Sequence, residues 1–211
     1  MLIVLLFIII SLPSYAKTKI TFLWWPDPGG GFEEVISDFE KENPDIDVEM
    51  IKGPTSTDIR EMMYITSFLA REATYDMVLM YIIWLPKFVK QGWLLPLDSW
   101  FGEEERKEFL PRDIKGSIFE GEIYRIPLQT DAGVLCYRKD LLEEKGYTPP
   151  KSWDEFVKIA KELQDPPNLW GFVFQGKQYE GLVCNFLEIL WSFGGDIFDE
   201  KGNLVLNFPK A

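Results

Sequence analysis

The chain contains no histidine among its 211 residues. That absence excludes a Ser-His-Asp triad, a histidine general base and the usual histidine-containing zinc sites. An enzyme with this sequence would have to use carboxylates, Lys, Tyr or Cys. Positive charge is also scarce, because 22 Lys and Arg stand against 34 Asp and Glu, for a net charge of -12. We therefore expect no nucleic-acid partner, since phosphate binding requires a basic surface.

Cysteine is nearly absent, with only Cys136 and Cys184 in the chain. Apolar residues precede both, and this pattern favours two buried small side chains over a disulfide. An exported protein could still form the bond, so the sequence leaves the pairing open.

Long apolar runs are missing except at the start of the chain, where residues 1–10 carry no charge. The run is too short to span a bilayer, which needs about 20 residues. Ser14-Tyr15-Ala16 follows it as a small-x-small cleavage site, so residues 1–16 are predicted to be a signal peptide. We expect a periplasmic or extracellular protein. An uncleaved anchor stays open, because no Lys or Arg precedes the run.

The chain beyond residue 16 alternates between strand and helix patterns. Apolar runs at residues 20–25 and 75–80 and an alternation of apolar and polar residues at 46–50 predict strands. Helical spacing predicts a helix after the strand at 20–25, ended by Asn43-Pro44, and another after the strand at 46–50, capped by Asp58. This order is typical of an α/β fold with a parallel sheet. Further along we predict strands at 123–128, 134–137 and 170–174, a capped helix from Ser152 to about Gln164, a buried helix at 181–193 and a hairpin around 199–202.

A glycine loop, Gly29-Gly30-Gly31, joins the first predicted strand to its helix. It lacks the G-x-G-x-x-G spacing, and Glu33 and Glu34 would repel a phosphate, so a nucleotide site is disfavoured. No spacing typical of a metal loop occurs either. The loop is better interpreted as one wall of a cleft, because open α/β sheets bind ligands at the carboxyl ends of their strands.

Aromatic residues make up 15% of the chain, and several polar-edged rings fall at predicted strand ends or loops. The clearest are Trp24, Trp25, Tyr81, Trp84 and Tyr179. Such rings suit a ligand with C–H faces and hydroxyl rims, such as a sugar. For any single ring a place in the core is the alternative.

Carboxylates occur at similar positions, namely Asp27, Asp131 and Glu180. A carboxylate accepts strong hydrogen bonds from sugar hydroxyls. Two carboxylates across a sugar cleft would equally serve a glycosidase, so the residues alone leave a binding protein and an exported glycosidase open.

Five stretches carry a family resemblance. They are Phe39-Glu40-Lys41-Glu42-Asn43-Pro44-Asp45-Ile46, Gly92-Trp93-Leu94-Leu95-Pro96-Leu97-Asp98, Ile123-Tyr124-Arg125-Ile126-Pro127-Leu128, Thr130-Asp131-Ala132-Gly133 and Pro149-Pro150-Lys151-Ser152-Trp153-Asp154-Glu155. In this order they resemble the extracellular solute-binding proteins of bacterial and archaeal ABC sugar importers, a group that includes maltose- and trehalose-binding proteins.

The resemblance implies a two-lobed periplasmic-binding-protein type II fold. Residues 17–130 would form the first α/β lobe and 131–211 part of the second, with a hinge crossing near 129–135. A di- or oligosaccharide of maltose or trehalose type would be held between the lobes, without reaction or cofactor, and passed to an ABC permease in the membrane. The implied ligand-binding residues are Trp25, Asp27, Tyr81, Trp84, Asp131, Tyr179 and Glu180.

The chain departs from the family in some places. Tyr81 stands where the family often has an Asp before the Trp, and Arg138 replaces a usual Asn. Family members are also roughly twice as long, so the chain looks like an N-terminal part whose further partner would be the remainder of the binding protein. We then expect the chain alone to bind sugar weakly or not at all, because half of the cleft wall is missing. A binding protein for peptides or polyamines is a third alternative.

Overall fold

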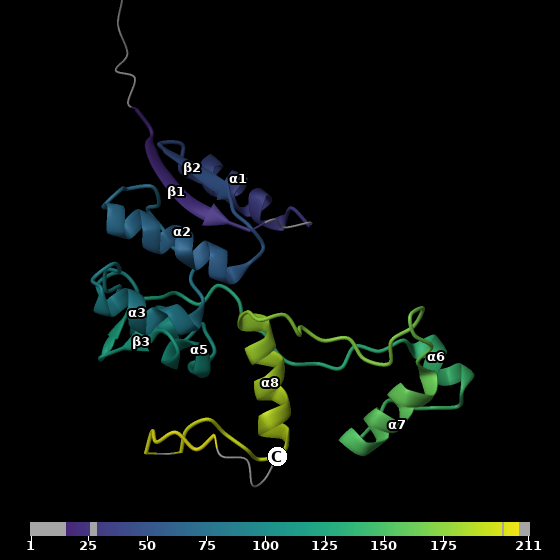
Figure 1. Ribbon diagram of the computed structural model, residues 1–211. Helices are drawn as coiled ribbons and strands as arrows, with labels where there is room; N and C mark the ends of the chain where they lie inside the picture. Colours follow the sequence, from purple (N-terminus) through teal and green to yellow (C-terminus); the bar gives the residue numbers. More distant parts are fainter. Residues whose placement is uncertain (1–15, 26–28, 200, 207–211) are drawn as a thin grey trace, which may run out of the picture. The chain divides into compact units, whose positions relative to one another are not determined.

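The computed structural model describes residues 16–25, 29–199 and 201–206. The predicted signal peptide, apart from Ala16, and the candidate Asp27 lie outside these residues. Within the described part of the chain, no helix is long and apolar enough to cross a membrane. The chain divides into two compact units, which we call unit 1, ending at Pro127, and unit 2, beginning at Leu128 (Figure 1). That boundary lies beside the predicted crossing near residues 129–135.

Unit 1 begins with a β-α-β motif. Strand β1 (Thr18–Trp24) and strand β2 (Ile46–Lys52) pair in parallel, and helix α1 (Gly31–Glu42) connects them. The register runs from Thr18 opposite Ile46 to Trp24 opposite Lys52. The helix ends before Asn43-Pro44, because the residue before a proline is disfavoured in helical conformation. These elements confirm the predicted α/β class.

The third predicted strand, at residues 75–80, is reduced to a single bridge. Met77 pairs in parallel with Phe22 on the free edge of β1. The Thr21 N–H donates to the Asp76 carboxylate at 2.8 Å, and Asp76 N–H donates to the Thr21 carbonyl at 2.7 Å. The Asp76 side chain thus accepts the hydrogen bond from the Thr21 N–H, which a backbone carbonyl would accept in a regular ladder. β1 nevertheless lies between β2 and this segment.

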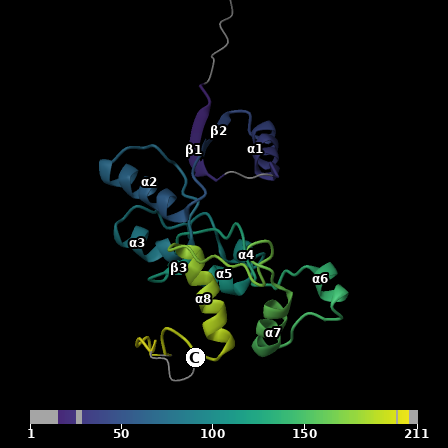
Figure 2. The same cartoon turned by 45° about the vertical axis from the view of Figure 1, so that its right-hand side comes forward.

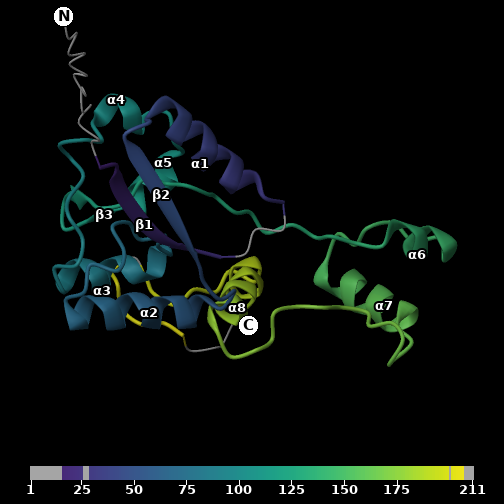
Figure 3. The same ribbon diagram turned by 90° about the horizontal axis from the view of Figure 1, so that it is seen from above.

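Helices cover both faces of the strand pair. Figures 2 and 3 show α1 on one side of β1 and β2 and helix α2 (Thr57–Ala70) on the other. The sequence predicted Asp58 as the cap of α2, but the N-cap is Ser56. Asp58 instead lies in the first turn, where a carboxylate interacts favourably with the helix dipole. The layered arrangement leaves the carboxyl ends of the strands free to carry ligand-binding side chains.

Four side chains with exposed fractions of 2% or less form the core of unit 1: Leu23, Tyr64, Trp84 and Phe88. Tyr64 on α2 donates its hydroxyl to the Leu23 carbonyl at 3.3 Å and accepts from Leu79 N–H at 3.2 Å. Trp84 ends a 3₁₀ turn, η1 (Ile82–Trp84), and Phe88 lies in helix α3 (Leu85–Lys90). The core therefore ties the first strand, α2 and α3 together.

The end of unit 1 contains α4 (Glu103–Arg106), α5 (Pro111–Lys115) and a two-stranded antiparallel sheet of β3 (Ile118–Phe119) and β4 (Glu122–Ile123). The predicted strand at 123–128 is wrong beyond Ile123, where β4 ends. Glu103, Glu104 and Glu105 are exposed, as a solvated helix face should be.

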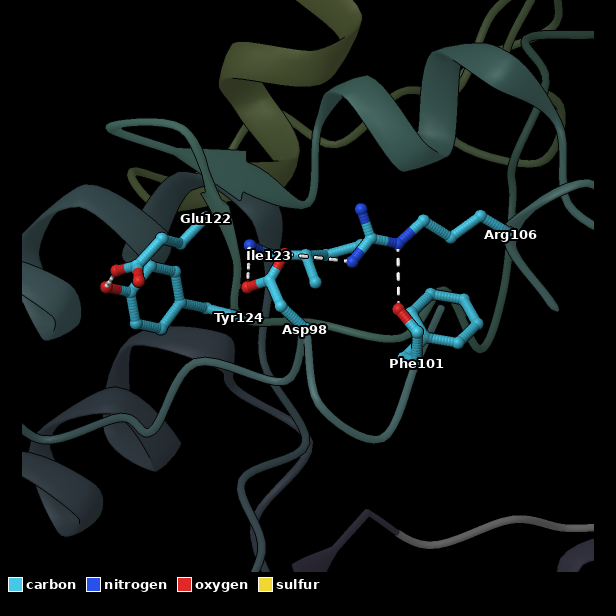
Figure 4. Close-up of polar contacts among 6 residues, drawn as sticks. All are labelled: Asp98, Phe101, Arg106, Glu122, Ile123 and Tyr124. Atoms are coloured by element: carbon cyan, nitrogen blue, oxygen red, sulfur yellow. Dashed lines mark hydrogen bonds and ion pairs between the residues drawn. The ribbon is translucent and has the colours of Figure 1, made fainter. Parts of the chain in front are cut away.

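Asp98 holds this end of unit 1 together (Figure 4). Its carboxylate accepts from Arg106 Nη2 at 2.9 Å and from Ile123 N–H at 3.1 Å. Arg106 Nε in turn donates to the Phe101 carbonyl at 2.8 Å. The hydrogen bond from Arg106 lowers the pKa of Asp98 below its ordinary value. Asp98 and Arg106 thus link the backbone of residues 101 and 123.

Unit 2 contains α6 (Lys139–Glu144), α7 (Trp153–Leu163) and α8 (Glu180–Ser192). The predicted cap of α7 is present, since the Ser152 hydroxyl accepts from Glu155 N–H at 3.2 Å. The Glu155 carboxylate accepts from Lys151 N–H at 2.8 Å rather than from the cap residue itself. The predicted hairpin is also confirmed, by an antiparallel bridge between Phe198 and Leu204.

Three predictions for unit 2 are wrong. Residues 134–137 and 170–174 form no ladder with any described residue, although both were predicted to be strands. A strand requires a neighbour for its N–H and C=O groups, and no described segment supplies one. Helix α8 was predicted to be buried nearly all round, but only Gly181 and Leu190 are buried and Trp191 is 55% exposed.

Gly171 is the described glycine of unit 2 at which an added Cβ would come nearest to backbone atoms. A Cβ added there would lie 2.3 Å from the Ala160 carbonyl oxygen of α7. We expect Gly171→Ala to lower the free energy of unfolding of unit 2 by about 1 to 3 kcal/mol, because backbone atoms must shift. Gly31→Ala is the control, since nothing lies within 4 Å of its added Cβ. Equal urea midpoints for the two variants would contradict this packing.

Candidate functional site

Two predicted ligand-binding rings lie at the carboxyl-end edge of the sheet in unit 1. Trp25 directly follows β1, and Tyr81 follows the segment that bridges to β1, and both are partly exposed. Arg60 on α2 lies between them. Its guanidinium carbon is 5.1 Å from the centroid of the Trp25 ring and 5.5 Å from that of the Tyr81 ring. Its Nη2 donates to the Tyr81 hydroxyl at 2.9 Å.

Sequence reasoning missed Arg60. A single arginine among the polar and apolar residues of a helix has no spacing that separates it from a solvated surface charge. Its exposed fraction of 3% and its two aromatic neighbours become visible only in the folded chain.

Trp25 belongs to an aromatic stack. Trp24 lies between Trp25, at a centroid distance of 4.4 Å, and Phe32 of α1, at 3.9 Å. Trp24 is 6% exposed, and its Nε1 has no acceptor among the described residues. Trp24 therefore acts as a buried support on which one face of Trp25 rests.

Trp84 lies in the core rather than on the cleft edge. It is 2% exposed and packs against Phe88 at 5.9 Å and Tyr64 at 6.2 Å. The Tyr81 ring lies 5.1 Å from it. With so little surface, Trp84 supports Tyr81 from beneath and leaves no ring face for a ligand.

The remaining candidates belong to unit 2. Tyr179 precedes α8, and its hydroxyl donates to the Gln175 side chain, while Glu180 is the first residue of the helix. The Glu180 carboxylate accepts a hydrogen bond from the Cys184 thiol at 3.0 Å. Asp131 is exposed and accepts from the Gln129 amide at 2.8 Å. Tyr179 and Glu180 lie together at the start of α8 because they are adjacent in the sequence.

The two cysteines are free thiols and both are exposed, so no disulfide joins them and the expectation of two buried side chains is wrong. Partial desolvation of the Cys184 sulfur, and then its hydrogen bond to Glu180, raises the pKa of this thiol to about 11. This thiol is therefore protonated at neutral pH and is a poor nucleophile. Within the described part of the chain, no three His, Cys, Asp or Glu residues gather to hold a metal ion.

Unit 2 also contains a cavity of about 520 Å³. Mostly apolar side chains line it, and none of the predicted ligand-binding residues is among them. Its polar lining includes Asn185, which accepts from Gln175 N–H at 2.9 Å, and Arg138, which donates to Asp140 at 2.8 Å. Each of these two groups thus has a hydrogen-bond partner within unit 2. Segments 134–138 and 169–174 border it, where the predicted strands have no ladder.

Comparison with known proteins identifies the family that has this architecture. The family model described as "Bacterial extracellular solute-binding protein" matches residues 25–211. A "Probable ABC transporter-binding protein" of Deinococcus radiodurans is 36% identical over 171 residues, which make up 78% of this chain and 40% of that protein. The chain thus spans about two fifths of the length of this curated relative.

Solved structures agree with that match. Maltose-bound MalE3 of T. maritima is 40% identical, with a TM-score of 0.85 over 92% of this chain and 50% of that one. A solute-binding protein of Agrobacterium vitis S4 with bound D-mannitol is 27% identical, with a TM-score of 0.74 over 92% of this chain and 48% of that one. The described units have the α/β architecture of type II periplasmic binding proteins and span about half of those chains. By the match over residues 25–211, the chain belongs to the family of bacterial extracellular solute-binding proteins.

Proposed function

We propose that the protein is the sugar-binding component of an ABC importer. One observation carries the proposal, namely the 40% identity and TM-score of 0.85 to a maltose-bound binding protein over 92% of this chain. The partly exposed rings of Trp25 and Tyr81 at the strand ends support it, because such rings can stack on the C–H faces of a sugar.

The proposed ligand is a di- or oligosaccharide of maltose type, with trehalose as a second candidate. Trp25 and Tyr81 would stack on it from unit 1, and Asp27, which follows Trp25 closely in the chain, would accept hydrogen bonds from its hydroxyls. From unit 2, Tyr179 would stack on the sugar, and Asp131 and Glu180 would accept hydrogen bonds from its hydroxyls, since carboxylates are strong acceptors. Trp84 would act by supporting Tyr81, which lies 5.1 Å from it.

The proposed cellular role follows from the same family. The protein would be exported to the periplasm or cell surface and would pass the sugar unchanged to a membrane permease. Binding would close the two units around the ligand at a hinge near residues 129–135, as in hinge-type binding proteins.

We expect the 211-residue chain to bind maltose weakly, with a dissociation constant of about 1 mM. It spans 50% of the maltose-bound relative, so it contains only part of the surface that encloses a ligand there. Incomplete enclosure lowers affinity, because less surface is buried and the binding groups are less well held.

Saturation-transfer NMR suits such weak binding. With about 10 mM maltose, roughly ten times the expected dissociation constant, we expect transfer from the protein to the sugar C–H protons. Tyr81→Ala should reduce the transfer strongly. Tyr137→Ala is the matched control, because Tyr137 is 48% exposed but belongs to unit 2 and to no proposed contact. Absent transfer, or equal transfer in both variants, would contradict sugar binding at these rings.

The same samples separate binding from glycoside hydrolysis. A binding protein leaves the maltose signals unchanged over days, whereas a carboxylate glycosidase releases glucose in proportion to its concentration. Thermal unfolding adds the third comparison. If peptides or polyamines raised the unfolding temperature of the protein and sugars did not, the ligand would be a peptide or polyamine instead of a sugar.

A further inference from the structure

Arg60 is a buried cation without a carboxylate partner in the described part of the chain. Its exposed fraction is 3%, and none of the ion pairs formed by described residues includes it. A buried charge is costly unless other groups compensate for its lost hydration. In this structure two aromatic rings and one hydroxyl provide that compensation.

Both rings belong to the proposed sugar site. The guanidinium carbon lies 5.1 Å from the Trp25 centroid and 5.5 Å from the Tyr81 centroid. A cation over an aromatic ring contributes about 0.5 to 1 kcal/mol at exposed sites and about 2 kcal/mol when desolvated. One rigid, planar group on α2 thus holds two rings that come from different segments of the chain.

The contact with Arg60 also determines whether the Tyr81 hydroxyl donates or accepts the hydrogen bond between them. A guanidinium can only donate hydrogen bonds, so the Tyr81 oxygen must accept the one from Nη2 at 2.9 Å. No described residue accepts the hydroxyl proton of Tyr81 in return. That proton remains available for donation to an acceptor on a ligand, such as a sugar ring oxygen or hydroxyl.

We propose that Arg60 is a positioning residue of the sugar site, which orients the Trp25 and Tyr81 rings and makes the Tyr81 hydroxyl a hydrogen-bond donor toward the ligand. The proposal rests on the proposed function. With 3% of its surface exposed, Arg60 itself acts through the rings rather than by touching the sugar.

The first test needs no ligand. In ¹H NMR spectra of the ligand-free chain, the Arg60 side-chain protons should be shifted upfield by the ring currents of Trp25 and Tyr81. Trp25→Ala and Tyr81→Ala should each remove part of this shift. Arg60 protons at ordinary positions, or unmoved by both substitutions, would overturn the positioning role even if the chain binds sugar. A shifted Arg60 with no sugar binding in the wild type would instead count against the proposed function alone.

The second test measures maltose affinity. Arg60→Met fills the buried space without the charge, and we expect about three- to tenfold weaker binding. Arg60→Lys should not restore the affinity, because an ammonium group lacks the planar fork. Ser67→Ala is the control, since Ser67 is also buried on α2 but bonds the Glu72 carbonyl at 3.0 Å. We expect Ser67→Ala to bind as the wild type does.

A double-mutant cycle tests whether Arg60 acts through the Tyr81 hydroxyl. Tyr81→Phe keeps the ring and removes the donor, so Arg60→Met should weaken binding less in the Tyr81→Phe background than in the wild type. Strictly multiplicative losses, or wild-type affinity in Arg60→Met, would overturn the positioning role. If Arg60→Met fails to fold, the same cycle built from Arg60→Lys, Tyr81→Phe and their double variant measures the coupling.

Discussion

Replacement of Trp84 by alanine is expected to lower the free energy of unfolding by about 3 to 5 kcal/mol, as large-to-small substitutions at buried aromatic positions do. Trp84 is 2% exposed and contacts Tyr64, Tyr81 and Phe88, so the lost ring leaves a cavity at the centre of unit 1. Urea unfolding followed by far-UV circular dichroism measures the change. A loss under about 1 kcal/mol would show that Trp84 is not a core residue.

Trp25→Ala is the matched comparison, because both tryptophans have the same predicted role in the sequence. Trp25 is partly exposed and rests on Trp24 at 4.4 Å. We expect a smaller loss of stability than in Trp84→Ala, together with maltose binding weakened on the order of tenfold. If Trp84→Ala were stable but unable to bind maltose, and Trp25→Ala were unstable, Trp84 would be the ligand-binding ring and Trp25 the core residue.

The second large effect is expected at alkaline pH. Burial raises the pKa of Tyr64 to about 12 from its ordinary value of 10.0. Between these values the unfolded chain has lost the phenolic proton and the folded chain has kept it, so stability falls as pH rises. Tyr64 should contribute its full stability below pH 10 and lose about 2 to 3 kcal/mol of it by pH 12.

Tyr64→Phe tests this titration. The variant leaves the Leu79 N–H and the Leu23 carbonyl without their partner, so it should be less stable by about 1 to 3 kcal/mol near neutral pH. Its stability should then fall less between pH 10 and 12 than that of the wild type. Identical pH dependence in the variant and the wild type would contradict the assigned role of Tyr64.

Local sequence patterns determined much of the fold of unit 1. Apolar runs and helical spacing predicted β1, α1 and β2, because periodicity reflects which side of an element meets the core. Asn43-Pro44 predicted the end of α1, and Ser152 with Glu155 predicted the start of α7, because these residues act on the backbone next to them. Five ordered stretches also indicated the family to which the chain belongs.

Other features depended on contacts between distant residues. Residues 134–137 and 170–174 have strand-like sequences, but a ladder requires a neighbouring segment with free backbone groups. No described segment provides one for them, so the local preference is not realised. Helix α8 has an apolar sequence nearly all round, yet Trp191 remains 55% exposed, because a helical side chain is buried only where another segment packs against it.

The sequence by itself determined the α/β class, the acidic charge and the set of aromatic residues from which a sugar site could be built. Only the tertiary structure separated Trp84, buried in the core, from Trp25 and Tyr81 at the strand ends, and placed Arg60 between those two rings. Burial and ring contacts depend on residues far apart in the chain: α2 brings Arg60 within 5.1 Å of a ring 35 positions earlier and 5.5 Å of one 21 positions later.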